Sequence, residues 1–209
     1  TYNGMIVVNC EKSAVPQLIF NGVTVYSETS AALYVMQAGK TVLTLTETEG
    51  EIAKGMIVEN LSDEAEAYIR RNLIRNNRAR GMLIAAKGEV EITGNHFHSG
   101  GAAIQFESDP MHWFECGGVT DVRIRDNLFE DCRHGTWGRA VIDICKRKKE
   151  VDGFYYHGII EITGNRFTQR NVPCVWADNV ENLIVKKNEY VSDTEVMAAH
   201  STVNGKTVE

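Results

Sequence analysis

The segment that begins at Glu107 carries the densest group of side chains that could do chemistry. It reads Glu-Ser-Asp-Pro-Met-His-Trp-Phe-Glu-Cys-Gly and contains the carboxyl groups of Glu107, Asp109 and Glu115 together with the indole of Trp113. Most glycosidases use two carboxyl groups, one as an acid and the other as a base or nucleophile. Functional residues are often placed on loops held by a rigid scaffold. The segment therefore predicts a sugar-binding loop; in the alternative, the Trp113 ring and its neighbour only fill space between the loop and the core.

A second group of candidates lies on short apolar runs at 81–85, 102–107, 140–145 and 173–178, which alternate as strands do. Aligning their inward residues gives two outward columns of side chains: Gln105, Asp143 and Trp176, then Glu107, Cys145 and Asp178. Such a face offers acceptors for sugar hydroxyls and one aromatic surface. Asp143 joins Asp109 and Glu115 as a candidate catalytic carboxylate. The alternative is a solvated sheet face with ordinary polar residues.

Two further patterns concern basic residues. Arg78 and Arg80 stand two apart at the start of a predicted strand, so both guanidinium groups would point to one side. They are candidate substrate contacts with Glu107, Asp109, Trp113 and Glu115, or else surface arginines that bind nearby carbonyls and acids. His96 and His98 have the i, i+2 spacing of two metal ligands on a strand, but no second histidine cluster follows in the sequence. We expect no metal site and no cofactor.

A six-residue phrase that recurs five times predicts the scaffold for these groups. Its template is an aliphatic residue, two polar residues, an asparagine, any residue and a large apolar residue. The five copies begin at Ile69, Ile92, Ile124, Ile162 and Val185, and they centre on Asn72, Asn95, Asn127, Asn165 and Asn188. Successive asparagines are 23, 32, 38 and 23 residues apart. Two of these spacings match one coil of a parallel β-helix, and the longer two leave room for loops inserted on one face.

The phrase has a physical interpretation in stacked coils. A single coil cannot bury its apolar face alone and must stack on its neighbours. We expect the asparagine at the turn, where it can adopt the left-handed conformation and form a ladder with its counterparts. The aromatic residue two positions later should point inward. A βαβ fold would need long amphipathic helical patterns between strands, and the sequence lacks them. The predicted fold is all-β, a right-handed parallel β-helix (a single-stranded solenoid) with a small N-terminal antiparallel β-subdomain.

The ends of the chain differ from the repeat. Residues 1–54 contain apolar runs without the asparagine phrase, and Asn21-Gly22 between two such runs is typical of a tight hairpin. We therefore expect an antiparallel β-subdomain or insertion over 1–54, the β-helix coils over 55–195, and a tail or partial cap over 196–209.

Composition excludes several classes of protein. The chain has 209 residues, a net charge of −6 and 43% hydrophobic residues, which is ordinary for a globular protein and gives no basic footprint for nucleic acid. No apolar run reaches the length of a membrane span. The odd count of five cysteines argues against a complete disulfide framework, so buried free thiols are expected.

Several phrases resemble glycoside hydrolase family 110 in order and spacing. These are Asn77-Arg-Ala-Arg-Gly81, Gly101-Ala-Ala-Ile104, Trp113-Phe-Glu115, Trp137-Gly-Arg-Ala140 and Asn165-Arg-Phe167, within about 60–190. The family consists of bacterial exo-α-1,3-galactosidases that remove terminal galactose, as from the blood group B antigen. The resemblance implies an inverting, metal-independent hydrolysis by two carboxyl groups, a glycan partner with terminal α-galactose, and a periplasmic or extracellular location.

The resemblance also implies that the acid and base lie elsewhere. Members of the family carry an adjacent Asp-Asp pair upstream of the Asn-Arg-Ala-Arg-Gly phrase, and these 209 residues contain no such pair. We therefore expect the C-terminal portion of a longer β-helix, inactive alone, whose N-terminal coils are partners in the same polypeptide. Two other functions stay open: a non-catalytic carbohydrate-binding or adhesin-like β-helix, and a β-helix polysaccharide lyase.

Overall fold

A computed structural model describes residues 2–3, 6–9, 11–15, 17–20, 25–26, 33–37, 42–45, 65–107, 117–145, 155–170, 172–191, 197–200 and 203–208. The chain divides into two compact units, Thr1–Val58 and Glu59–Glu209. All regular elements of the described residues are strands, and no helix among them is long and apolar enough to pass through a membrane.

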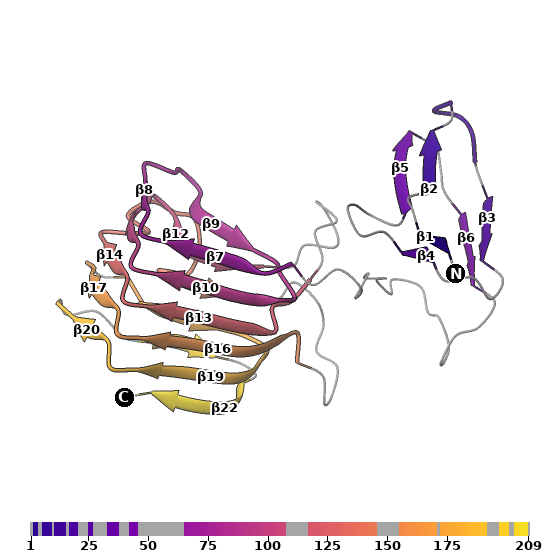
Figure 1. Cartoon of the computed structure of the whole chain (residues 1–209). Helices are drawn as coiled ribbons and strands as arrows, with labels where there is room; N and C mark the ends of the chain where they lie inside the picture. The colour runs from indigo at the N-terminus through magenta and orange to yellow at the C-terminus, as the bar shows by residue number, and fades with distance from the viewer. Residues whose placement is uncertain are drawn as a thin grey trace. The chain divides into compact units, whose positions relative to one another are not determined.

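The second unit consists of three parallel sheets (Figure 1). The first sheet contains β7 (Ala67–Arg70), β10 (Glu89–Thr93), β13 (Asp121–Arg125), β16 (His157–Thr163), β19 (Val180–Lys186) and β22 (Val203–Val208). The second sheet contains β8 (Leu73–Arg75), β11 (His96–His98), β14 (Leu128–Glu130), β17 (Arg166–Thr168) and β20 (Glu189–Tyr190). The third contains β9 (Arg80–Ile84), β12 (Ala102–Phe106), β15 (Ile142–Ile144), β18 (Val175–Ala177) and β21 (Met197–His200).

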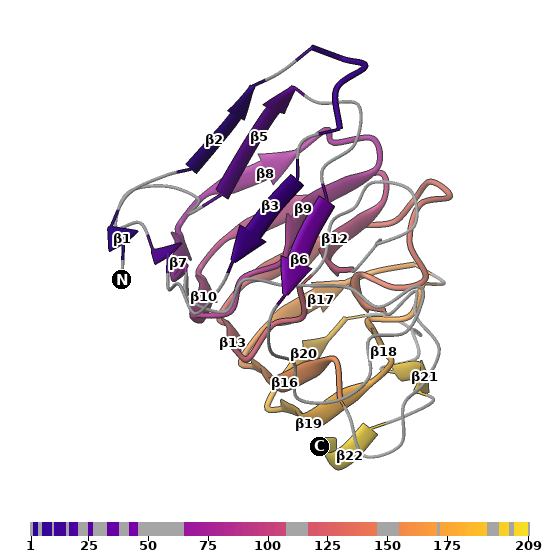
Figure 2. The same cartoon turned by 90° about the vertical axis from the view of Figure 1, so that its right-hand side faces the viewer.

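The chain visits the three sheets in a fixed order, so each coil adds one strand to each sheet. The strands of one sheet lie one above another in both views (Figures 1 and 2). This is the strand arrangement of a parallel β-helix; its handedness stays a prediction. β21 pairs with β18 and β22 pairs with β19, so these two strands continue the third and first sheets. The tail or partial cap expected over 196–209 stays a prediction.

An asparagine ladder joins the coils at the turn between the first and second sheets. The Oδ1 atom of Asn127 accepts hydrogen bonds from the backbone N and the Nδ2 of Asn95, at 2.8 and 3.0 Å. Asn165 receives the same two bonds from Asn127, both at 2.9 Å. Asn72 and Asn188 extend the ladder at either end. The prediction that the five asparagines occupy equivalent corners of stacked coils is confirmed.

The left-handed residue of this turn is not the asparagine, as we had expected, but the residue before it. That position holds Arg71, Gly94, Asp126, Gly164 or Lys187, with φ between 54° and 66°. The asparagine itself is the one whose side chain faces the neighbouring coils. The two roles fall on different residues for a physical reason. The ladder needs an amide side chain at a fixed angle, whereas the turn needs only a residue that tolerates positive φ.

The interior is filled by aligned apolar columns. Phe97, Phe129, Phe167 and Tyr190 stack with ring centroids 5.0, 4.8 and 5.5 Å apart, which confirms the inward aromatic position of the phrase. In the first sheet Ile92, Ile124, Ile162 and Val185 stand in register and are fully buried. Each such side chain contributes roughly 1.5–3 kcal/mol through burial. Cys132, Cys145 and Cys174 are buried free thiols, as expected.

The described strand pairs of the first unit are parallel. They join β1 (Tyr2–Asn3) to β4 (Val25–Tyr26), β2 (Ile6–Asn9) to β5 (Leu33–Gln37), and β3 (Gln17–Phe20) to β6 (Val42–Leu45). The antiparallel subdomain is therefore not confirmed. Asn21 and Gly22 lie outside the described residues, but the strands that flank them, β3 and β4, pair with different partners and do not form the expected hairpin. The order of pairing is that of two three-strand coils without the asparagine phrase.

Candidate functional site

The outer face of the third sheet carries the column predicted from the sequence. Gln105 of β12 is the register partner of Asp143 of β15, and Asp143 is the partner of Trp176 of β18. Adjacent strands of a sheet lie about 4.8 Å apart, so the three side chains form a continuous row. The row is more enclosed than the outward face we expected, because Gln105 is 8% and Asp143 only 2% exposed.

Residues 131–141 enclose this row. They connect β14 to β15 and form the longest described connection between the second and third sheets. Backbone hydrogen bonds fix the connection to the coil that carries β12: Arg133 N donates to Ser99 O at 2.8 Å, and Gly135 N donates to Gly100 O at 2.7 Å. A further bond runs from Ala102 N to Trp137 O at 3.1 Å. Fourteen residues separate β12 from β13 and twelve separate β15 from β16 in the sequence, whereas two residues connect the first sheet to the second in each described coil.

A pocket of about 330 Å³ lies between the row and this connection. We call it the third-sheet pocket; its lining consists of Arg80, Gln105, Glu107, Trp137, Gly138, Arg139, Asp143 and Cys145. Carboxylate, amide, guanidinium and indole groups therefore meet in one cavity. This combination can bind the hydroxyl groups of a sugar and cover one of its apolar faces.

Asp143 and Arg139 form the best-defined contact of the pocket. The Nε and Nη2 atoms of Arg139 donate to Asp143 Oδ1 at 3.1 and 2.8 Å, and the backbone N of Arg139 donates to Oδ2 at 2.9 Å. Hydrogen bonds between a guanidinium and a carboxylate are stronger than those between neutral groups. The guanidinium also lies over the Trp176 ring, with Cζ 4.5 Å from its centroid. Both carboxylate oxygens of Asp143 are therefore held by Arg139, which fixes this side chain in the wall of the pocket.

Glu107 supplies the second carboxylate of the pocket. Its side chain is 9% exposed, and Oε2 accepts a hydrogen bond from Gln105 Nε2 at 2.6 Å. Burial, followed by the negative charges of Asp143 and Glu107, raises the pKa of the neighbouring Cys145 thiol to about 12. Cys145 is thus a neutral thiol and not a nucleophile.

The structure brings only part of the predicted site together. Glu107, Asp143 and Arg80 share the third-sheet pocket, whereas Arg78 lines a neighbouring cavity of about 410 Å³. The expectation that both arginines point to one place is wrong, although both cavities share Trp137. Asp109, Trp113 and Glu115 lie outside the described residues, so their roles stay predictions.

Sequence reasoning missed Trp137 and Arg139 as site residues. Trp137 is 48% exposed, and the guanidinium of Arg78 lies 5.4 Å from the centroid of its ring. Both residues belong to the connection and not to a strand, so period-two alternation could not place them. The phrase Trp137-Gly-Arg-Ala140 was noted only as part of a family resemblance.

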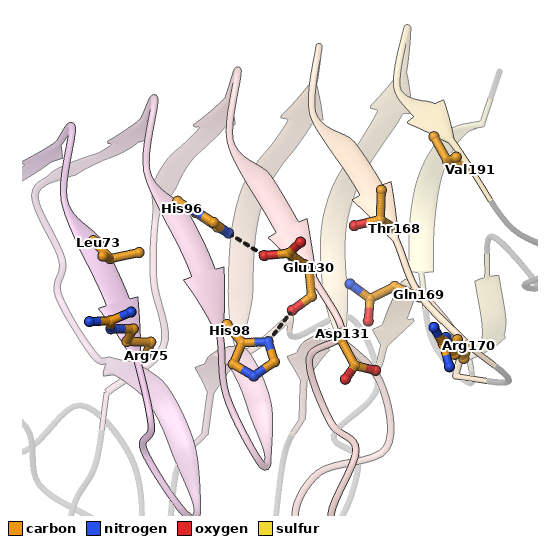
Figure 3. Close-up of a pocket in the computed structure, with 10 residues that line it drawn as sticks. All are labelled: Leu73, Arg75, His96, His98, Glu130, Asp131, Thr168, Gln169, Arg170 and Val191. Atoms are coloured by element: carbon orange, nitrogen blue, oxygen red, sulfur yellow. Dashed lines mark hydrogen bonds and ion pairs between the residues drawn. The ribbon is translucent and has the colours of Figure 1, made fainter.

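A larger hollow of about 720 Å³ lies on the second sheet (Figure 3). Its lining consists of Leu73, Arg75, His96, His98, Glu130, Asp131, Thr168, Gln169, Arg170 and Val191. His96 Nε2 is 2.8 Å from Glu130 Oε2, so His96 is paired with this carboxylate and does not form a metal site with His98. The hollow contains none of the predicted sugar contacts, and we place the candidate sugar site in the third-sheet pocket.

Comparison with known proteins gives two kinds of match. A family model described as "Carbohydrate-binding domain-containing protein" matches residues 1–99. Alpha-1,3-galactosidase B of Bacteroides thetaiotaomicron is 34% identical over 162 residues, which cover 76% of this chain and 26% of that protein. Alpha-1,3-galactosidase B of Akkermansia muciniphila is 34% identical over 149 residues, or 69% of this chain and 19% of that protein. The protein of the same name from Phocaeicola vulgatus is 33% identical over 159 residues.

These matches confirm the resemblance to glycoside hydrolase family 110: over about 70% of its length, the chain is a homologue of proteins named alpha-1,3-galactosidase. The matches fit the C-terminal portion of a member of that family. The chain spans about a quarter or less of the length of the two relatives from Bacteroides and Akkermansia.

Proposed function

We propose that this chain forms the sugar-binding face of a glycoside hydrolase that removes terminal α-1,3-linked galactose from glycans. The observation that carries the proposal is the third-sheet pocket, in which Asp143, Arg139, Gln105 and Glu107 converge. The names of the relatives suggest the linkage and the sugar. The β-helix, taken as right-handed, provides the rigid face on which the pocket stands.

The proposed mechanism is inverting and uses two carboxyl groups, one to protonate the leaving oxygen and one to activate water. Asp143 is assigned to substrate binding, because Arg139 fixes its carboxylate in the wall of the pocket. The guanidinium of Arg139 also covers the ring of Trp176, the register partner of Asp143. Arg139 therefore contacts both the carboxylate and the aromatic ring. The acid and base are assigned to residues of a longer polypeptide that carries this chain.

Release of galactose from an α-1,3-linked galactoside by the full protein tests the activity. Proton NMR of the first product tests the stereochemistry, since inversion of an α-galactoside gives β-galactose first. We expect Asp143→Asn to lower kcat/KM by about 10- to 100-fold, as for loss of a hydrogen bond to a charged group. Glu91→Gln is the matched control, because Glu91 pairs with Arg70 on the first sheet.

Full activity of Asp143→Asn would show that the third-sheet pocket does not bind the substrate. If α-galactose is the first product, the mechanism is not inverting.

A non-catalytic carbohydrate-binding β-helix is the second candidate, favoured by the family model that matches residues 1–99. It predicts that the full protein binds a galactoside without cleaving it. Equilibrium binding of the glycan with no galactose released would support this candidate against the hydrolase. We also propose a periplasmic or extracellular location, where glycans with terminal galactose occur; fractionation that finds the protein in the cytoplasm would contradict it.

A further inference from the structure

A cluster of two imidazoles and one carboxylate stands at the end of the second sheet, where β11 and β14 lead into their next connections. His98 is the last residue of β11, and Asp131 and His134 follow β14. One ligand atom from each of the three lies within 4.8 Å of the other two. Figure 3 shows His98 and Asp131 side by side on adjacent coils. The sequence could not indicate this group, because its members are 33 and 3 residues apart.

Backbone carbonyls fix the tautomer of both histidines. His98 Nδ1 lies 3.0 Å from Glu130 O, and His134 Nδ1 lies 2.8 Å from Asp131 O. Because a carbonyl oxygen can only accept a hydrogen bond, each Nδ1 must carry the proton. The lone pair of each neutral ring is then on Nε2. Metal-binding histidines are oriented in this way, with the second ring nitrogen donating to a carbonyl or carboxylate.

The scaffold also restricts how the ligands can move apart. Asp131 N donates to Thr168 O at 2.9 Å, and Arg133 N donates to Ser99 O at 2.8 Å, so the turn that holds the cluster is bonded to the coils on both sides. The rings of His98 and His134 have centroids 5.3 Å apart. Zinc bonds of about 2.0–2.1 Å require ligand atoms roughly 3.3 Å apart in a tetrahedron. The ligand atoms, now up to 4.8 Å apart, must therefore close by up to about 1.5 Å, and His134 is the exposed member of the cluster.

We propose that His98, Asp131 and His134 bind a divalent cation of the zinc type, with water as the remaining ligand. Imidazole and carboxylate together suit Zn²⁺ better than Mg²⁺ or Ca²⁺, which prefer oxygen ligands alone. The role is structural. The cation ties the end of β11 to the start of the 131–141 connection, which carries Trp137 and Arg139 to the third-sheet pocket. The proposal does not depend on the sugar chemistry.

The positive charge of Arg75 opposes the cation and gives a further test. Arg75 is the register partner of His98 on β8 and lines the same hollow. Its removal should strengthen cation binding, because a like charge close to the ion disfavours the bound state. The Arg75→Gln variant therefore has an expected effect opposite in sign to that of the ligand variants.

The experiment is calorimetric titration of ZnCl₂ into the tag-free, chelator-treated protein. We expect one Zn²⁺ per chain and a thermal midpoint raised by roughly 5–10 °C at about 100 times Kd. Asp131→Asn should weaken binding at least about 10-fold while retaining a residue that tolerates the φ of 43°. His134→Ala should also weaken binding at least about 10-fold, and because His134 is exposed the substitution should not disturb the core. His96→Ala is the matched control, since His96 pairs with Glu130 and stands outside the cluster.

Cobalt substitution gives an independent measurement, because the absorption of bound Co²⁺ reports its ligands and geometry. Binding lost in Asp131→Asn and His134→Ala, retained in His96→Ala and strengthened in Arg75→Gln would support the site. No heat on titration, or equal affinity in the wild type and both ligand variants, would overturn it. Equal weakening by His96→Ala would also overturn it, because the cation would then be bound by the open face of the sheet.

Discussion

Substitution of Asn127 by alanine tests the asparagine ladder at its centre. Asn127 is 2% exposed and has ladder partners on both sides. Its Nδ2 donates to Ile92 O at 2.8 Å and to Asn165 Oδ1 at 2.9 Å. Its Oδ1 accepts from the backbone N and the Nδ2 of Asn95. Alanine removes all four bonds and leaves the backbone almost unchanged.

The expected cost follows from the groups left without a partner. The backbone N of Asn95 and the carbonyl of Ile92 lose the bonds described. Asn95 Nδ2 keeps its bond to Ile69 O, and Asn165 Oδ1 still receives the backbone N of residue 127. Each buried group left unsatisfied costs about 1–3 kcal/mol. We therefore expect Asn127→Ala to lower the free energy of unfolding by about 2–6 kcal/mol. Asn72→Ala, at the exposed end of the ladder, should cost less than about 1 kcal/mol.

Urea unfolding followed by circular dichroism measures both variants against the wild type. The two m-values should agree with that of the wild type, so that the midpoints report stability alone. Hydrogen exchange at the Asn95 amide gives a local readout, since this N–H loses its acceptor in Asn127→Ala. Equal losses of stability in the two variants would refute the reasoning, because the ladder would then contribute no more at its buried centre than at its solvated end.

Two further predictions concern the core. Phe129→Ala should lower the free energy of unfolding by about 3–5 kcal/mol, because Phe129 is sandwiched between the rings of Phe97 and Phe167; a loss below about 1 kcal/mol in urea unfolding would contradict this. Burial lowers the pKa of His157 to about 4, so the folded state holds this ring neutral. The neutral ring contributes fully to the free energy of unfolding above about pH 6.5. About 3 kcal/mol of that free energy is lost as the pH falls from about 6.5 toward 4. The unfolding midpoint of His157→Gln should fall less steeply over this range, and an equally steep fall would refute the assignment.

The repeat could be predicted because its chemistry is specific at one position. Only an amide side chain offers a donor and an acceptor that fit the strand spacing, so the asparagine recurs even where the spacing varies. The phrase therefore located the stacked turns and the inward aromatic residues such as Phe129. The left-handed position was placed one residue too late, since five different turns use Arg, Gly, Asp or Lys there. A position that accepts four residue types cannot be recognised from the residue found there.

The first unit was misjudged for a related reason. Its strands lack the asparagine phrase, and Asn21-Gly22 suggested a hairpin instead. Parallel pairs such as that of β2 with β5 join residues 27 positions apart, from Ile6 to Leu33, so no local pattern indicates them. The apolar runs indicated β-structure there, whereas pairing direction depends on contacts between distant segments.

The candidate site was predictable only where it lies on strands. Gln105, Asp143 and Trp176 follow from alternation and register, and the structure places them in one row. Trp137 and Arg139 reach the pocket from a connection whose path depends on backbone bonds to the neighbouring coil. Such a path cannot be derived from residue spacing. The same limit applies to His134, whose proximity to His98 follows from the turn after β14.

The contrast between the short turns and the long connections has an evolutionary consequence. Two residues join the first sheet to the second in every coil of the described repeat, whereas the segments that border the third sheet differ in length. Insertions there leave the hydrogen-bonded corner intact, so they are far less costly than changes at that corner. Relatives can therefore diversify in ligand preference by exchanging these segments, and an engineer could graft a new segment over 131–141 without redesigning the framework beneath it.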